Sequence, residues 1–130
     1  VQGTVYVNAN ASLRAVGARV NGNVQGENAA AVRVLKGSSI GGAFQVVQSG
    51  VASLRDSSVG GDVLIDSNDG ANDVRRNGVG GSVQAFQNTG GVAIFRNTVD
   101  GNLQCKENVP APTGGANVVD GNREDQCRTF

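Results

Sequence analysis

The sequence lacks histidine, methionine and tryptophan, and it has only two prolines, two cysteines and 4% aromatic residues. Without histidine, the Ser-His and Cys-His pairs that activate nucleophiles are excluded. The 11 basic and 11 acidic side chains cancel, whereas a nucleic-acid binder needs a strongly basic face. No apolar run approaches the roughly 18 residues that suggest a membrane span. We therefore expect no nucleic-acid partner, no membrane insertion, no cofactor and no enzymatic activity.

The chain is instead rich in glycine, which makes up 20 of 130 residues, about twice the usual share of about 7%. Many of these glycines belong to a repeated motif of the type Val-Gly-Gly-Ser-Val-Gln. Its seven copies start 19 or 20 residues apart, at Val1, Val20, Ile40, Val59, Val79, Val99 and Val119. A constant period near 20 predicts a solenoid. The leucine ladder of a leucine-rich repeat is missing, so short apolar strands between Gly and Asn turns favour a β-helix.

Within each copy the apolar residues alternate, so they are expected to face the same side of a strand. The third residue is always Gly, which is expected where two backbones approach too closely for a Cβ atom. The core and corner positions of the central copies are Val20, Gly22, Ile40, Gly42, Val59, Gly61, Val79, Gly81, Val99 and Gly101. A second apolar column is predicted five residues before each later motif, at Ala15, Leu35, Leu54, Val74 and Ile94. A third, very short wall is expected around each motif start.

These patterns predict an all-β fold, a single-stranded parallel β-helix of seven coils with about 20 residues each. We favour right-handed winding, because left-handed helices usually use six-residue units. Residues 1–98 are expected to form coils, and residues 99–130 the last coils and a cap of the same continuous domain. The Val-x-Gly-x-Val steps resemble parallel β-helix proteins, a class that includes pectate lyases, tailspikes and bacterial surface proteins. The tail from Val99 to Cys127 is similar to the ends of small secreted actinobacterial proteins of unassigned role.

Two polar columns also recur. One contains Gln25, Gln45, Gln84 and Gln104, interrupted by Leu64; the other contains Ala18, Ser38, Ser57, Asn77, Asn97 and Asn117. Stacked strands lie about 4.8 Å apart, so like amides can hydrogen-bond along the stack. Asparagine also tolerates the left-handed conformation that sharp corners require.

The end of the chain departs from the pattern. Residues 109–115, which include both prolines, are expected to replace the second strand of their coil. Cys105 and Cys127 are expected to form a disulfide, with free or intermolecular thiols as the alternative. A chain that opens at Val1 within a repeat suggests a processed mature product, and a disulfide favours a secreted or cell-surface location.

Three charged groups are candidate sites. Asp100 and Asp120 share a column and could be solvated carboxylates, shared calcium ligands or, at about 5 Å, the pair of a retaining glycosidase. The acidic stretch containing Asp66 and Asp69 is a turn or a loose calcium loop. Stacked cations require nearby acids or an anionic polymer such as a uronate or sulfated polysaccharide; the candidates are Lys36, Arg55 and Arg75.

The sequence as a whole suggests a non-catalytic, secreted structural solenoid. Its first coil would leave backbone groups unpaired, and a head-to-tail contact there would not close, so filaments or a surface coat are expected. The alternatives are a carbohydrate-binding module for acidic polysaccharide and an unassembled scaffold that uses the glutamine column.

Overall fold

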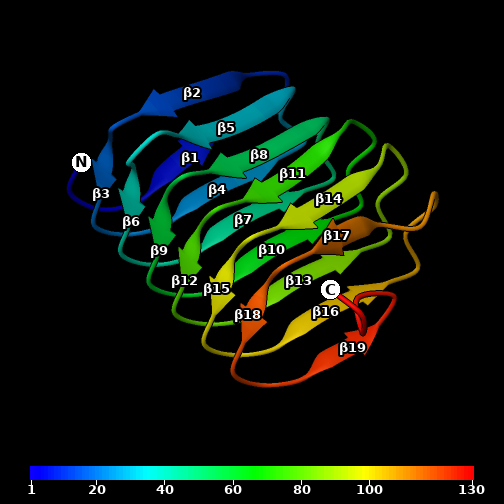
Figure 1. Cartoon of the computed structure of the whole chain (residues 1–130). Coiled ribbons are helices and arrows are strands. Elements are labelled where there is room, and N and C mark those ends of the chain that lie inside the picture. Colours follow the sequence, from blue (N-terminus) through cyan, green and yellow to red (C-terminus); the bar gives the residue numbers. More distant parts are fainter.

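A computed structural model describes residues 1–130 and contains nineteen strands in three parallel sheets, with no helix (Figure 1). Sheet A consists of β1 (Val5–Val7), β4 (Val24–Glu27), β7 (Phe44–Val47), β10 (Val63–Asp66), β13 (Val83–Phe86), β16 (Leu103–Lys106) and β19 (Arg123–Asp125). Sheet B consists of β2 (Ser12–Val16), β5 (Ala31–Leu35), β8 (Val51–Arg55), β11 (Asn72–Arg75), β14 (Val92–Phe95) and β17 (Thr113–Gly115). Sheet C consists of β3 (Arg19–Val20), β6 (Ser39–Ile40), β9 (Ser58–Val59), β12 (Gly78–Val79), β15 (Thr98–Val99) and β18 (Val118–Val119).

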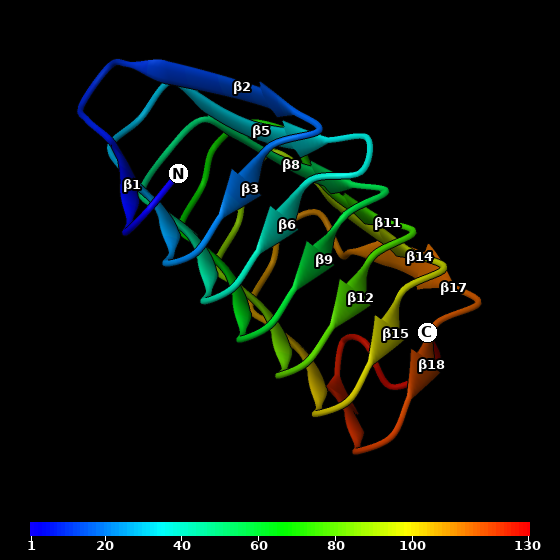
Figure 2. The same ribbon diagram turned by 90° about the vertical axis from the view of Figure 1, so that its left-hand side faces the viewer.

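The chain visits the sheets in the order A, B, C and then begins the next coil, which confirms the parallel β-helix and its short third wall. In Figure 2 sheet C faces the viewer and the stack advances towards the lower right, while each front strand runs from upper right to lower left. This path is the right-handed winding favoured from the sequence. The seventh repeat supplies only β19, so six coils are complete rather than seven. At about 4.8 Å per coil the stack is about 30 Å long.

The core is a column of apolar side chains enclosed by the three sheets. Twenty-four buried residues form one cluster, and Phe44, Leu54, Ile65, Ile94 and Leu103 are among its fully buried members. Val79 is paired with Val59 on one side and with Val99 on the other. Each coil therefore buries its apolar positions against the same positions of its neighbours, and burial of about 25 cal/mol per Å² stabilises the stack.

The backbones of neighbouring coils approach each other closely at the glycine column, as the sequence predicted. A Cβ atom on Gly81 would overlap the carboxylate of Asp62 and lie 2.9 Å from the backbone of Gly61. Similar collisions would arise at Gly42 and Gly101. The column is therefore fixed by the spacing between coils, because no side chain fits between backbones stacked this closely.

Two local predictions were wrong. Leu35 does not belong to the inner column, since Val34 pairs with Leu54 and Leu35 lies one position further along the strand. The coil has an extra residue at the following corner, where Lys36 and Gly37 have φ angles of 50° and 80°. The proline segment does not remove the second strand either, because β17 still pairs with β14 in a shortened form.

The sheets pass through residue 98 without interruption, since β15 spans it. The structure contains no helix that is long enough and apolar enough to cross a membrane.

Candidate functional site

Two buried polar ladders follow two corners of the triangular cross-section. At the corner between sheets B and C, Asn77 donates its side-chain amide to Asn97 Oδ1 at 3.1 Å, and Asn97 donates to Asn117 Oδ1 at 3.0 Å. The backbone amides of Asn77 and Asn97 also donate to the Oδ1 atoms of the next coil. This confirms the predicted asparagine ladder and shows that each rung satisfies a backbone N–H group of the preceding coil.

The sequence reasoning missed the second ladder, at the corner between sheets A and B. It contains Asn68, Asn88 and Asn108, all at most 2% exposed. Asn88 donates to Asn108 Oδ1 at 2.9 Å and to the Ile65 carbonyl oxygen at 3.1 Å. The recurrence of Asn at positions 68, 88 and 108, 20 residues apart, was the signal that could have revealed it.

The ladder asparagines do not themselves take the left-handed conformation that asparagine tolerates. The positive φ angles belong to the residue before each rung, for example Arg76 and Arg96 before Asn77 and Asn97. At the other corner Gln87 and Glu107 precede Asn88 and Asn108 in the same way. A left-handed conformation costs an L-residue about 1–2 kcal/mol. The buried asparagine that follows supplies hydrogen bonds that offset this strain in the later coils, whereas serine or alanine follows the corner in the earlier coils.

The outer glutamine column of sheet A is confirmed as a surface ladder. Gln25 donates to Gln45 Oε1 at 3.0 Å, Gln84 donates to Gln104 Oε1 at 2.9 Å, and Gln104 donates to Glu124 Oε2 at 2.7 Å. These amides are half-buried and paired with one another. The ladder therefore strengthens sheet A, and it is interrupted above Gln45, which is paired in register with the apolar Leu64.

A hollow of about 560 Å³ lies on the same face, over the first three coils. Tyr6, whose side chain is 69% exposed, lines it together with Gln25, Gln45 and Glu27. It is the one surface concavity in which an exposed aromatic ring meets a row of amides.

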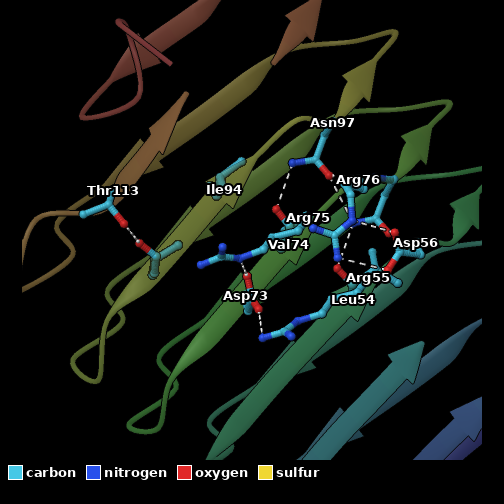
Figure 3. A network of polar contacts seen from close by, with 12 residues as sticks. Leu54, Arg55, Asp56, Asp73, Val74, Arg75, Arg76, Ile94, Asn97 and Thr113 are labelled. Atoms are coloured by element: carbon cyan, nitrogen blue, oxygen red, sulfur yellow. Dashed lines mark hydrogen bonds and ion pairs between the residues drawn. The ribbon is translucent and has the colours of Figure 1, made fainter. Parts of the chain in front are cut away.

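The basic column predicted from the sequence is only partly assembled. Arg55 and Arg75 are neighbours in register on β8 and β11, but Lys36 lies in the corner with the extra residue, where its N–H donates to the Arg55 carbonyl oxygen. Asp73, on the same face, forms ion pairs with both Arg55 and Arg75 (Figure 3). The guanidinium of Arg75 also lies 5.0 Å from the centre of the Phe95 ring. An acid within the fold therefore relieves the expected repulsion.

Asp56 pairs with Arg76 of the next coil through hydrogen bonds from Nε at 2.6 Å and from Nη2 at 3.1 Å. The hydrogen bond from Arg76 is the main cause that holds the pKa of Asp56 below its usual value, and the positive charges of Arg76, Arg55 and Lys36 act in the same direction. Because both side chains are exposed, solvent screens this pair.

The four calcium candidates, each of which would need several oxygen ligands, occupy two separate parts of the stack. Asp100 and Asp120 lie on successive coils, where each backbone N–H donates to the coil before it, and Asp66 accepts a hydrogen bond from Ser67 Oγ. No group of three or more His, Cys, Asp or Glu side chains gathers anywhere in the molecule. Asp69 belongs to the turn before β11, where its N–H donates to the Ser49 carbonyl oxygen.

The C-terminal tail (residues 126–130) closes the stack. Cys127 forms the predicted disulfide with Cys105, and both are fully buried. Gln126 Oε1 accepts from the backbone and side-chain amides of Asn108 at 3.0 Å. The Phe130 carbonyl oxygen accepts the corresponding bonds from Asn117 at 3.2 Å. The tail thus supplies the last acceptor of both buried ladders.

No part of residues 1–130 covers the first coil in this way. An apolar cavity of about 140 Å³ opens there, and we call it the N-terminal mouth. Leu13 and Ala15 are only partly buried at this end, and β1, β2 and β3 each pair on one side only. Its apolar lining comprises Val1, Val5, Leu13, Ala15, Ala18, Val20, Val24, Val34 and Ile40.

Comparison with known proteins adds no name to this architecture: the chain matches no family model, no curated protein and no solved structure.

Proposed function

We propose that this protein is a non-catalytic structural solenoid that is secreted and associates end to end through its first coil. The observation that carries the proposal is the N-terminal mouth, where apolar side chains and three unpaired strand edges occur together. Unpaired strand edges are templates for pairing with another chain, and an exposed apolar patch gains from being covered.

The use of polar residues supports a structural role. The buried asparagines bond to backbone groups and to one another along the stack, so they stabilise the rod and do not face a cleft. The disulfide is compatible with an oxidising compartment outside the cytosol. A rigid rod with one open end is suited to building a filament or a surface coat.

Sedimentation velocity over a range of protein concentrations tests this proposal, with negative-stain electron microscopy of the same samples. We expect the wild-type sedimentation coefficient to rise with concentration. Leu13→Glu, which places a charge in the mouth, should remain monomeric. Val1→Asp is a milder variant at the rim, because Val1 is 67% exposed, and it should weaken association without loss of fold.

Thr98→Glu is the matched control, because it adds the same charge at an exposed position on the side of the rod. It should associate like the wild type. A wild-type protein that stays monomeric at every concentration would overturn the proposal, as would unchanged association of Leu13→Glu.

The hollow around Tyr6 favours a second candidate, carbohydrate binding. An exposed ring can stack on a sugar while the amides of Gln25 and Gln45 reach its hydroxyl groups. The column of basic residues expected to bind acidic polysaccharide is a weaker candidate, because Asp73 forms ion pairs with Arg55 and Arg75. Electrophoresis through gels containing soluble neutral or acidic polysaccharide tests it: Tyr6→Ala should abolish any retardation, whereas Gln104→Ala, distant on the same column, should not.

A further inference from the structure

The charged side chains are segregated along the solenoid axis. Residues 1–55 carry five basic and one acidic side chain, a net charge of +4, and residues 56–130 carry six basic and ten acidic ones, a net charge of −4. Because coils are stacked in sequence order (Figure 1), the neutral chain is a rod with a positive N-terminal half and a negative C-terminal half. The charged residues of the first half are Arg14, Arg19, Glu27, Arg33, Lys36 and Arg55.

This separation extends to the two ends. Arg14 and Arg19 are exposed on the first coil, and no acidic residue precedes Glu27. At the other end Asp120 is exposed and Glu124 half-buried. Two basic side chains are also present there, but Arg123 is engaged with the fold through a hydrogen bond from Nη2 to the Asn117 carbonyl oxygen at 2.8 Å, and Arg128 is exposed. Opposite ends of two copies therefore attract, whereas two N-terminal ends repel.

The third corner, between sheets C and A, carries an exposed ladder of hydrogen bonds. This ladder also differs between its two ends, with a donor at the N-terminal end and an acceptor at the C-terminal end. Here a backbone N–H group donates to the side chain of the preceding coil: Asn23 N–H to Thr4 Oγ1 at 3.3 Å, and Asn122 N–H to Asn102 Oδ1 at 2.8 Å. The ladder thus begins with the N–H group of Thr4 and ends with Oδ1 of Asn122. Donor and acceptor meet when the first coil of one copy faces the last coil of another, and two first coils would bring two donors together.

The two buried ladders are complete within one molecule, so an end-to-end contact need not displace the C-terminal tail. They begin at Ala18 and Ala29, whose N–H groups donate to Ser38 Oγ and Ser49 Oγ. They end on the tail, which satisfies Asn108 and Asn117. Neither ladder requires an additional coil, so the tail stays in place and the contact covers the N-terminal mouth without unfolding the cap.

We propose that the end-to-end contact is polar: the first coil of one molecule, which carries Arg14 and Arg19, binds the last coil of a second copy, which carries Asp120 and Glu124. This inference rests on the proposed function and adds the direction of assembly. A heterologous contact of this kind does not close, so it produces open filaments and not dimers.

Sedimentation velocity of charge-reversal variants tests the direction. We expect Arg14→Glu/Arg19→Glu and Asp120→Lys/Glu124→Lys each to raise the dissociation constant of association by about tenfold or more. An equimolar mixture should associate again, because the first variant keeps a normal last coil and the second a normal first coil. Fluorescent labels of two colours should show both chains in each complex. Raising the NaCl concentration to about 0.5 M should weaken wild-type association, because salt screens exposed charges.

The outcomes separate the two proposals. If the wild type associates and Asp120→Lys/Glu124→Lys associates equally well, the first coils bind each other and the polar contact is wrong, while end-on association stands. If the wild type does not associate at all, the proposed function itself fails. Reversal of Arg96, which is exposed and lies several coils away from the first coil, controls for net charge and should have less effect than reversal at Arg14 and Arg19.

Discussion

The two ends of the solenoid differ in how their terminal coils are covered. A stacked fold must leave the core and the backbone groups of its terminal coils uncovered unless something closes them. At the C-terminal end, the tail covers the core with Cys127 and Phe130 and supplies the last acceptors of two ladders. At the N-terminal end, Leu13 and Ala15 remain partly exposed around an apolar cavity. The comparison shows that residues 126–130 close one end, whereas no part of residues 1–130 closes the other.

The buried ladders change in the same direction. Along the corner between sheets B and C, the rungs are Ala18, Ser38, Ser57, Asn77, Asn97 and Asn117. A serine rung such as Ser38 makes one bond to the preceding coil and one within its own. Asn97 bonds to the Val74 carbonyl oxygen and to both neighbouring rungs. Polar stabilisation therefore increases from the open end towards the capped end.

Among the changes that test this contrast, removal of the disulfide at the C-terminal end should cause the largest loss in the free energy of unfolding. The bond links residues 22 positions apart, and a loop of that length contributes about 3 kcal/mol to the free energy of unfolding. We expect Cys105→Ser/Cys127→Ser to lose about that amount in urea denaturation. Wild-type protein treated with a reductant should show the same loss; if neither treatment changes the midpoint, the tail does not depend on the bond.

Substitutions in the ladder between sheets B and C should show that its contribution to stability increases towards the C-terminal end. Asn97→Ala removes the side-chain bond to the Val74 carbonyl oxygen and leaves the buried Asn77 N–H group without a partner, so we expect a loss of about 2–3 kcal/mol in the free energy of unfolding. Ser38→Ala near the open end should cost about 1 kcal/mol. Chemical denaturation of both variants measures the difference, and equal losses would contradict the gradient.

Amide hydrogen exchange should show the same contrast without mutation. We expect peptides from β2 to exchange at least about tenfold faster than peptides from β14, because β2 pairs on one side only and packs less deeply. Mass spectrometry at concentrations at which the protein is monomeric measures these rates. If exchange in β2 slows as concentration rises while β14 is unchanged, the N-terminal mouth becomes covered on association.

The smallest effect is expected at Asp56, near the boundary between the two charged halves. Because the folded-state pKa of Asp56 lies below its usual value, its pairing stabilises the fold above the pKa of the unfolded chain, and this contribution is lost as the pH falls through the folded-state pKa. Asp56→Asn should slightly lower the melting temperature at pH 7. At a pH well below the usual aspartate pKa, the two melting temperatures should converge, and a constant difference would assign the effect to a cause other than charge.

The sequence predicted the repeat, the inner column, the glycine approach, the disulfide and one buried ladder, because each depends on residue type at a fixed period. It failed where the period shifts by one residue, as at Lys36 and Gly37, since the extra residue at the corner is visible only in the strand register. It also failed where the fold determines conformation: Arg76 and Arg96 take the left-handed corners although Asn follows each of them. The pairing of Asp73 with Arg55 and Arg75 joins neighbouring coils, and the cover provided by Phe130 depends on the path of the tail.

At the corners of the later coils, a residue with a left-handed backbone is followed by a buried asparagine. This repeated pattern would allow coils to be added to the rod. Each coil presents to its neighbour the same pattern of donors and acceptors that it receives, as between Asn68, Asn88 and Asn108. A duplicated 20-residue segment within the asparagine-rich coils would therefore find compatible neighbours above and below. Such a duplication would extend the rod by about 4.8 Å and leave both ends unchanged, so the length of the rod can change without a change in the structure of its ends.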